Sequence, residues 1–243
     1  MSDEVRPAFY ALAPAGWRDY VTLLHVPYSL WHLSYVAIGA ALAPELRVGR
    51  LLAALAAFFL AVGIGAHALD ELSGHPLRTR IPDRVLGGLA VVAIAGAVAI
   101  GVAGAIAFDL WLLGFVAVGT VLVVAYNLEL AGGVLHNDAT FALAWGAFPL
   151  LTGYFANAGT ISAGALLAAG FAACASLAQR RLSTHARRVR RHVQRVSGAL
   201  ELDGGGSEPV TAELLLGPAE AALRTLAAAI VLLATALVVL RVG

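Results

Sequence analysis

Long apolar runs are the feature of this sequence that most limits its fold. A helix that crosses a membrane needs about 20 consecutive, mostly apolar residues. Runs of about this length occur at residues 23–43, 51–69, 86–107, 110–128, 139–156, 161–178 and 219–240. They are continuous rather than alternating and rich in Ala, Leu and Gly, which favours helices over membrane strands. We therefore predict an all-α, polytopic transmembrane helix bundle of about seven spans, with residues 1–243 as a single integral membrane domain.

The composition agrees with a membrane protein and excludes several other classes. Hydrophobic residues make up 60% of the chain and charged residues 13%, and the mean hydropathy is +0.84, which is too apolar for a soluble globule. The first apolar run is too long for a signal-peptide core, so no cleaved leader is expected. The single cysteine, Cys174, excludes an intramolecular disulfide or a thiolate metal cluster. No nucleotide-binding loop occurs, and no nucleic-acid partner is expected.

The arginines predict how the chain is oriented in the membrane. All 16 basic residues are arginine. With the spans as above, twelve lie on the side of the N-terminus, whereas only Arg47, Arg50 and Arg241 lie on the opposite side, and Arg224 falls within the last run. By the positive-inside rule, the N-terminus and the turns after the second, fourth and sixth runs are predicted to be cytoplasmic.

Polar clusters follow those same three runs. They are HALDELSGH at 67–75, YNLELAGGVLHND at 126–138 and RRLSTHARRVRRHVQR at 180–195. The turns on the other side are short and nearly featureless. One membrane face is therefore predicted to carry the chemistry or binding, although the arginines could serve only as topological anchors.

The first cluster holds the strongest candidates for a site. His67, Glu71 and His75 are spaced i, i+4, i+8, which on a helix puts them on one face, and Asp70 lies beside His67. Because Pro76 disfavours helix at the residue before it, His75 could instead lie in the following loop. Acids at the end of a span are functional candidates by default. The alternative is that they only mark the interface, paired with Arg78 or Arg80.

These residues carry a resemblance to the UbiA superfamily of membrane prenyltransferases. The x3 spacing of residues 67, 71 and 75 resembles the family's NxxxDxxxD motif, and LRTRIP at 77–82 resembles the turn that follows it. The first run, LLHVPYSLWHLSYVAIGAALAP, and residues 125–156 are also similar to the family's helices. The resemblance implies an all-helical enzyme that takes a polyprenyl chain from its diphosphate. It also implies roles for residues at the cytoplasmic face: Asp70, Glu71, His67 and His75 as catalytic groups, Asp70, Glu71 and His67 as metal ligands, and Asn127, Glu129 and Asp138 at the mouth of the site.

The chain departs from the family in three ways. The second acidic motif is replaced by LAQRRLSTHARRVRR, two of the metal-ligand positions are histidine, and seven helices stand where nine are usual. The resemblance implies Mg²⁺, but histidine ligands favour Fe, Mn or Zn. Arginine forks could bind a diphosphate without a second metal; the candidates are Arg78, Arg80, Arg180, Arg181, Arg187, Arg188 and Arg191. The alternative for residues 180–196 is an amphipathic helix lying on anionic lipid. Residues 180–218 are accordingly predicted as a cytoplasmic basic segment followed by a flexible linker from residue 200.

The leading function is prenyl transfer to an acceptor or cyclisation of an isoprenoid diphosphate, with the lipid bilayer and an isoprenoid lipid as partners. A second possibility is a metal- or haem-binding redox protein that uses His25, His32, His67 and His75. A third is a lipid-binding protein without catalysis, since fold alone does not imply activity. His25, Ser29 and His32 share one helix face, which predicts a polar cavity, and Asp138 is predicted to cap the fifth span.

Overall fold

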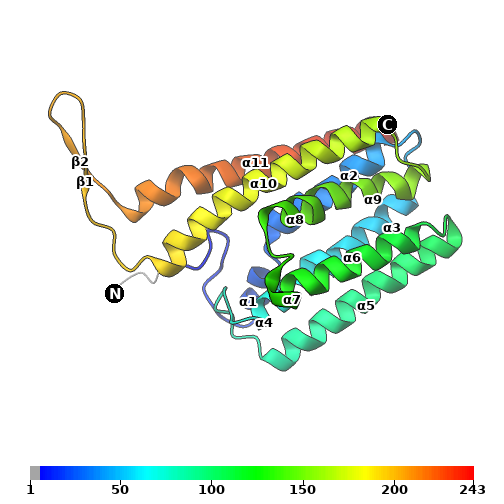
Figure 1. Cartoon of the computed structure of the whole chain (residues 1–243), viewed down its shortest axis with the longest axis horizontal. Coiled ribbons are helices and arrows are strands. Elements are labelled where there is room, and N and C mark those ends of the chain that lie inside the picture. The colour runs from blue at the N-terminus through cyan, green and yellow to red at the C-terminus, as the bar shows by residue number, and fades with distance from the viewer. Residues whose placement is uncertain (1–5) are drawn as a thin grey trace.

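Helices run side by side along the length of the molecule, as the apolar runs predict (Figure 1). The computed structural model describes residues 6–243. The described elements are α1 (Trp17–Leu23), α2 (Val26–Leu42), α3 (Val48–Phe58), η1 (Phe59–Ala66), α4 (His67–Leu72), α5 (Asp83–Ala107), α6 (Leu112–Asn127), α7 (Leu130–Gly133), α8 (Asp138–Ala142), η2 (Leu143–Ala147), α9 (Phe148–Ala158), α10 (Ala163–His192), β1 (Ala199–Glu201), β2 (Ser207–Pro209) and α11 (Ala212–Val242). The all-α bundle is therefore confirmed, with a two-stranded hairpin as the sheet of the described chain.

Several of these helices are long and apolar enough to cross a membrane. Within residues 6–243, four continuous helical segments meet this description: Val48–Leu72, Asp83–Ala107, Asp138–Ala158 and Ala212–Val242. They are 25, 25, 21 and 31 residues long, against the about 20 residues that a bilayer requires. Helix α6 is equally apolar but shorter. These helices indicate an integral membrane protein.

Two of these four long helical segments, which we call rods, contain a π-helical stretch. In the rod Val48–Leu72 it is η1, and in the rod Asp138–Ala158 it is η2, which ends at Ala147, two residues before Pro149 in α9. Proline cannot donate a backbone hydrogen bond and crowds the preceding turn, so the wider turn of η2 accommodates it. Such π-turns are frequent at functional sites, and both of these border the cavities described below.

Glycines allow α2 and α9 to pack closely. A side-chain Cβ at Gly39 of α2 would collide with the backbone of Leu150 in α9, and one at Gly153 would collide with the backbone of Val36. Small residues at such contacts let the backbones of membrane helices approach each other. The contact fixes α2, which carries His32, against the rod that carries Trp145.

The third polar segment differs from its prediction. Residues 180–192 continue α10 as part of one 30-residue helix, so they do not begin a separate helix. Residues 199–209 form the antiparallel hairpin β1–β2 rather than a flexible linker, because the glycines of the DGGG turn take positive φ angles, 95° at Gly204 and 85° at Gly205. Helix α11 already begins at Ala212, where the Thr211 hydroxyl accepts a hydrogen bond from the N–H of Leu214.

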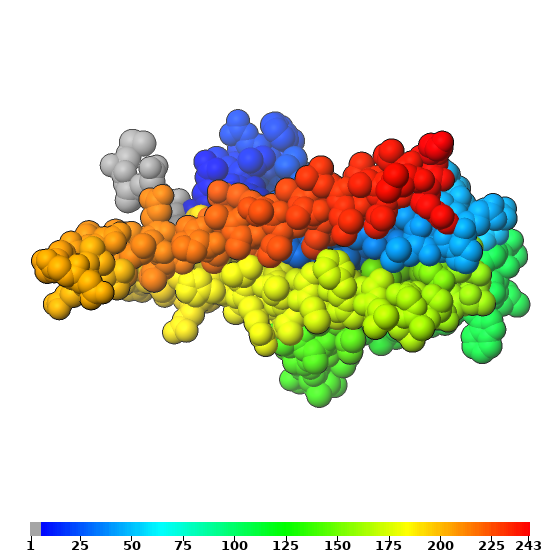
Figure 2. Space-filling view, turned by 90° about the horizontal axis from the view of Figure 1, so that it is seen from above, coloured from blue at the N-terminus to red at the C-terminus, as the bar shows by residue number. Residues whose placement is uncertain are grey.

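The two ends of the bundle are unlike. The turn after α4, the short helix α7 and the hairpin lie at one end, whereas the C-terminal end of α11 lies at the other (Figure 1). Figure 2 shows the hairpin and the adjoining ends of α10 and α11 projecting beyond the other helices. The three polar clusters therefore meet at one end of the molecule, which we call the polar end.

Candidate functional site

A small pocket at the polar end gathers side chains from all three clusters. It encloses about 110 Å³ among the N-terminal segment, α2, α4, α6, α10 and α11. Six of the residues predicted for catalysis, metal or diphosphate binding line it, namely His67, Asp70, Asn127, Arg180, Arg187 and Arg191. We call this space the polar pocket.

Histidines form one wall of the polar pocket. The rings of His25 and His67 stack with centroids 3.9 Å apart and planes at 17°. Nδ1 of His67 lies 3.2 Å from the carbonyl oxygen of Gly63, and Nδ1 of His32 lies 2.8 Å from that of Trp145. Because a carbonyl oxygen only accepts, Nδ1 is the donor in both rings, and the neutral forms of His67 and His32 keep Nε2 as an acceptor.

His25 has an unusual backbone. Its φ and ψ angles are 45° and 47°, the left-handed conformation, which costs a residue with a Cβ roughly 1–2 kcal/mol. This bend separates α1 from α2, and the His25 carbonyl starts α2 by accepting from the N–H groups of Tyr28, at 2.7 Å, and Ser29, at 3.1 Å. The predicted first span, 23–43, is therefore broken at His25. Nε2 of His25 is buried and has no hydrogen-bond partner among the described residues.

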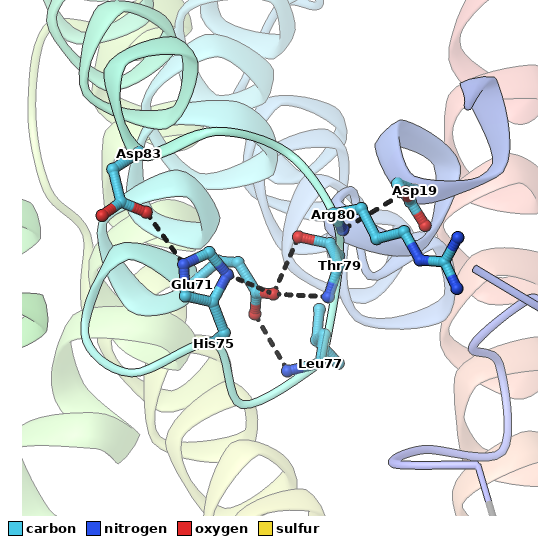
Figure 3. Close-up of polar contacts among 7 residues, drawn as sticks. All are labelled: Asp19, Glu71, His75, Leu77, Thr79, Arg80 and Asp83. Carbon is cyan, nitrogen blue, oxygen red and sulfur yellow. Dashed lines mark hydrogen bonds and ion pairs between the residues drawn. The ribbon is translucent and has the colours of Figure 1, made fainter. Parts of the chain in front are cut away.

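Glu71 is fully buried and bound to the loop that follows α4 (Figure 3). Its Oε2 accepts from the N–H of Leu77 at 2.9 Å, while its Oε1 accepts from the N–H of Thr79 at 2.9 Å and from the Thr79 hydroxyl at 2.8 Å. Nδ1 of His75 lies 3.4 Å from the same Oε1. Glu71 does not line the polar pocket. Its carboxylate folds residues 73–82 back against the end of α4.

Asp70, the neighbouring acid, points elsewhere. It lines the polar pocket together with His67. Within residues 6–243, its carboxylate makes no hydrogen bond and no ion pair, in contrast to that of Glu71. Of the two adjacent acids, Asp70 is therefore the one available to a ligand.

Arginines of α10 form the opposite wall. Arg190 binds Glu220 through two nitrogens, at 2.5 and 2.9 Å, so its charge is compensated. Arg191 donates from Nε to the carbonyl oxygen of Pro7 at 3.2 Å. Neither Arg187 nor Arg191 forms an ion pair with a carboxylate of the described chain. Two guanidinium groups that form no ion pair make this wall suited to an anion.

Arg180 ties α10 to α6 and α8. Its Nε lies 2.6 Å from Oδ1 of Asp138, and its NH1 donates to the hydroxyl of Tyr126. Asp138 was predicted to cap the fifth span, and this is wrong. The cap is Asn137, whose Oδ1 accepts from the N–H of Thr140 at 2.9 Å because Asn137 has the extended backbone that a capping residue needs.

Several predicted site residues lie outside the polar pocket. They are Glu71, His75, Arg78, Arg80, Glu129, Asp138, Arg181 and Arg188. His75 lies in the loop after α4 with a φ of 52°, so the loop alternative is the one observed. Its Nε2 bonds to Oδ1 of Asp83 at 2.9 Å, and this hydrogen bond raises the pKa of His75. The exposed Glu129 lies 3.6 Å from His136.

The donor set of the polar pocket does not fit a magnesium cage. Among the described residues, no group of three or more His, Cys, Asp or Glu side chains is arranged to hold a metal ion. Glu71 is engaged by the loop and Glu220 by Arg190, which leaves Asp70 as the uncommitted carboxylate of the pocket. Mg²⁺ prefers several oxygen ligands, whereas this pocket offers one such carboxylate and two free arginines.

An apolar cavity adjoins the polar pocket. It is a half-open space of about 520 Å³ among the rod Val48–Leu72, α5, α6 and the rod Asp138–Ala158. Val62 and Trp145 line both spaces, so they form the boundary between them. At the far end the guanidinium of Arg50 lies 3.4 Å above the ring of Phe108, and both residues line the cavity. The combined space is polar and positive at the end of the polar pocket and apolar along most of its length, with the Arg50 guanidinium at the far end.

Some lining residues were not predicted from the sequence. They include Tyr10, Tyr28, Gln179, Arg190 and Glu220. Burial raises the pKa of Tyr10, which keeps its hydroxyl protonated as a hydrogen-bond donor. One signal did exist in the sequence: Glu220 is an acid near the start of the last apolar run, with Arg224 at i+4. For Tyr10 there was none, because residues 6–16 carry no periodic pattern.

Comparison with models of known protein families, with curated proteins and with solved structures finds no match to this chain.

Proposed function

We propose that this protein is a membrane enzyme of UbiA-like type that acts on an isoprenoid diphosphate, by prenyl transfer or by cyclisation. The observation that carries the proposal is the pair of spaces that meet at Val62 and Trp145. A positively charged polar pocket and an apolar cavity of about 520 Å³ match the two halves of an amphiphile with an anionic head and a hydrocarbon tail.

The diphosphate would bind to the arginine wall. Arg187 and Arg191 are separated by four residues on α10, so they lie on the same face of the helix. Guanidinium groups bind phosphate oxygens with two parallel hydrogen bonds, and these two make no ion pair within residues 6–243 that would have to be broken first. The hydrocarbon chain would then extend past Trp145 into the apolar cavity.

The reaction follows from this placement. The bond between the first carbon of the chain and the diphosphate oxygen breaks, and the electron pair leaves with the diphosphate, whose added charge Arg187 and Arg191 stabilise. The resulting allylic cation lies near the boundary residues, within reach of the Asp70 carboxylate, which opposes its positive charge. It is then captured by an acceptor, which loses a proton as the new bond forms, or by a double bond of its own chain, after which the new carbocation loses a proton. Because the donor set does not fit a magnesium cage, no step is assigned to a metal.

The proposal includes the predicted topology. Besides the four long apolar segments, α2, α6 and α10 run along the bundle and would complete the seven spans of this proposal. The bias of the arginines puts the polar end and the N-terminus in the cytoplasm, where a soluble diphosphate product would be released.

The test uses the purified protein in detergent or nanodiscs with isoprenyl diphosphates of increasing chain length. Release of diphosphate and formation of a new lipid, both identified by mass spectrometry, would support the enzyme. Binding of the lipid diphosphates without release would favour the lipid-binding alternative, for which the apolar cavity alone would suffice. If the protein neither bound these lipid diphosphates nor released diphosphate from them, the proposal would be overturned.

A further inference from the structure

His25 combines two unfavourable features at the wall of the polar pocket. Its backbone is left-handed, with φ at 45°, and its buried Nε2 has no hydrogen-bond partner among the described residues. Strained backbone and orphaned buried polar atoms concentrate at functional sites, where the surroundings hold them in place. Both features occur here in one residue that faces a pocket.

The fold does not need the imidazole of His25. The side chain makes no capping hydrogen bond to α2; the His25 backbone carbonyl accepts the first hydrogen bonds of this helix. The ring is held only by aromatic contacts, stacked on His67 at 3.9 Å and tilted against Tyr10 with centroids 5.2 Å apart. Glycine would adopt the left-handed conformation without a steric penalty. The ring is thus held in one position by its aromatic neighbours, but its Nε2 makes no hydrogen bond within the described structure.

We propose that Nε2 of His25 accepts the proton that the acceptor substrate loses, and that this acceptor carries an O–H or N–H group. The inference rests on the proposed function. As the bond from the first carbon to diphosphate breaks, a lone pair on the acceptor oxygen or nitrogen forms the new bond to that carbon. The proton of the same O–H or N–H group passes to Nε2, which gives the imidazolium form of His25. The diphosphate keeps the electron pair of the broken bond.

The charges around His25 suit this role. The titratable and charged groups that line the pocket with it are Tyr10, Tyr28, His32, His67, Asp70, Tyr126, His136, Arg180, Arg187, Arg190, Arg191 and Glu220. Arg180 is paired with Asp138 and Arg190 with Glu220, which leaves Arg187 and Arg191 as the two arginines without an ion pair. Before the reaction, the two arginines favour a neutral ring, which is the basic form. After proton transfer, the Asp70 carboxylate and the bound diphosphate stabilise the imidazolium.

The test compares His25→Gln and His25→Gly with His32→Gln as a matched control, since His32 lies in the same pocket but uses its Nδ1 on Trp145. Both His25 variants should keep or raise the melting temperature in detergent and keep the thermal shift caused by an isoprenyl diphosphate. Their turnover should fall about 10²-fold or more, the scale for losing a general base, and the acidic limb of the pH–rate profile should disappear. His32→Gln should lower the melting temperature but keep that limb.

Two results would overturn the inference while leaving the proposed function standing. One is an active wild type whose rate and acidic limb are unchanged in His25→Gln, which would assign the proton to another acceptor. The other is a large fall in melting temperature in His25→Gly that accounts for the loss of activity, which would give the ring a structural role. A wild type that neither binds nor turns over isoprenyl diphosphates would overturn the proposed function itself, and this inference with it.

Discussion

Glu71 holds Thr79 through two hydrogen bonds to a single carboxylate oxygen, from the backbone N–H at 2.9 Å and from the hydroxyl at 2.8 Å. Asp70, one residue earlier, makes no such bond within the described chain and faces the polar pocket instead. On a helix, adjacent residues point about 100° apart, so the two acids of this pair have different surroundings. They should therefore respond differently to the loss of their charge.

Glu71→Gln should destabilise the fold. The amide of glutamine has one acceptor oxygen, so its NH₂ group would face one of the donors of Leu77 or Thr79 and leave that donor unpaired. A buried unpaired donor costs about 1–3 kcal/mol. Thermal or denaturant unfolding in detergent would measure the change. A variant as stable as wild type would show that the loop does not depend on the carboxylate.

Asp70→Asn should lower the activity and leave the stability of the fold unchanged. Since Asp70 bonds to none of the described side chains, its replacement should leave the melting temperature nearly unchanged. Product formation per unit of folded protein should fall by about 10²-fold or more, the scale for losing a group that stabilises charge in a transition state. Full activity in Asp70→Asn would remove this residue from the reaction.

The sequence was sufficient to predict an all-helical bundle and the meeting of the polar clusters at one end of it. Both depend on local information, because a continuous apolar run specifies a span wherever it packs. Pro76 likewise predicts that His75 can leave the helix, as it does. The prediction placed the cap of the fifth span at Asp138, one residue after the observed cap Asn137. Both residue types cap well, and only backbone geometry separates them.

The distribution of roles among neighbouring residues could not be predicted. Arg187 and Arg188 differ by one position, and the sequence does not reveal which side of α10 turns inward. The partners of Glu71 come from a loop six and eight residues later, whose shape depends on left-handed residues such as His75 and Arg78. The boundary of Val62 and Trp145 joins residues far apart in the chain, a contact that only the packed bundle creates.

The ion pair of His75 with Asp83 should make stability depend on pH. The hydrogen bond to Asp83 raises the pKa of His75 in the folded protein above its ordinary value of about 6.5. Folding therefore favours the protonated form, so the stabilisation is fully present below pH of about 6.5 and is lost as pH rises through the raised pKa. The effect should be small because the pair is exposed to solvent.

Asp83→Asn provides the comparison for this effect. The difference in melting temperature between wild type and Asp83→Asn should be largest at acidic pH and should decrease as the pH rises above neutrality. Loss of the Asp83 charge at the start of α5 adds an offset that does not vary over this range. A difference that is constant from pH 5 to 9 would show that His75 does not contribute.

The topology can be tested by reporters at the two ends of the bundle. A reporter inserted between Gly204 and Gly205, in the turn of the projecting hairpin, should be cytoplasmic. A reporter fused after Gly243 should lie on the other side, because α11 separates the two positions. Reporters at both positions on the same side would mean that α11 does not cross the membrane.

The arginines of α10 provide a prediction with a control on the same helix. Arg187 and Arg191 line the polar pocket, whereas Arg181 and Arg188 of the same helix do not line it. Replacing both members of the first pair by glutamine should weaken binding of an isoprenyl diphosphate by at least about tenfold, since each hydrogen bond to a charged group contributes about 1.5–3 kcal/mol.

The same two substitutions at Arg181 and Arg188 remove an equal charge from the helix, so they should leave this affinity unchanged if the pocket is the binding site. They would weaken binding equally if the arginines acted only by attracting anions to the surface of the protein, an effect that salt would suppress. The measurement is the dissociation constant for the same lipid diphosphate at low and at high ionic strength. Equal losses in the two double variants at low salt would contradict a diphosphate site in the polar pocket, even if the enzyme proved active.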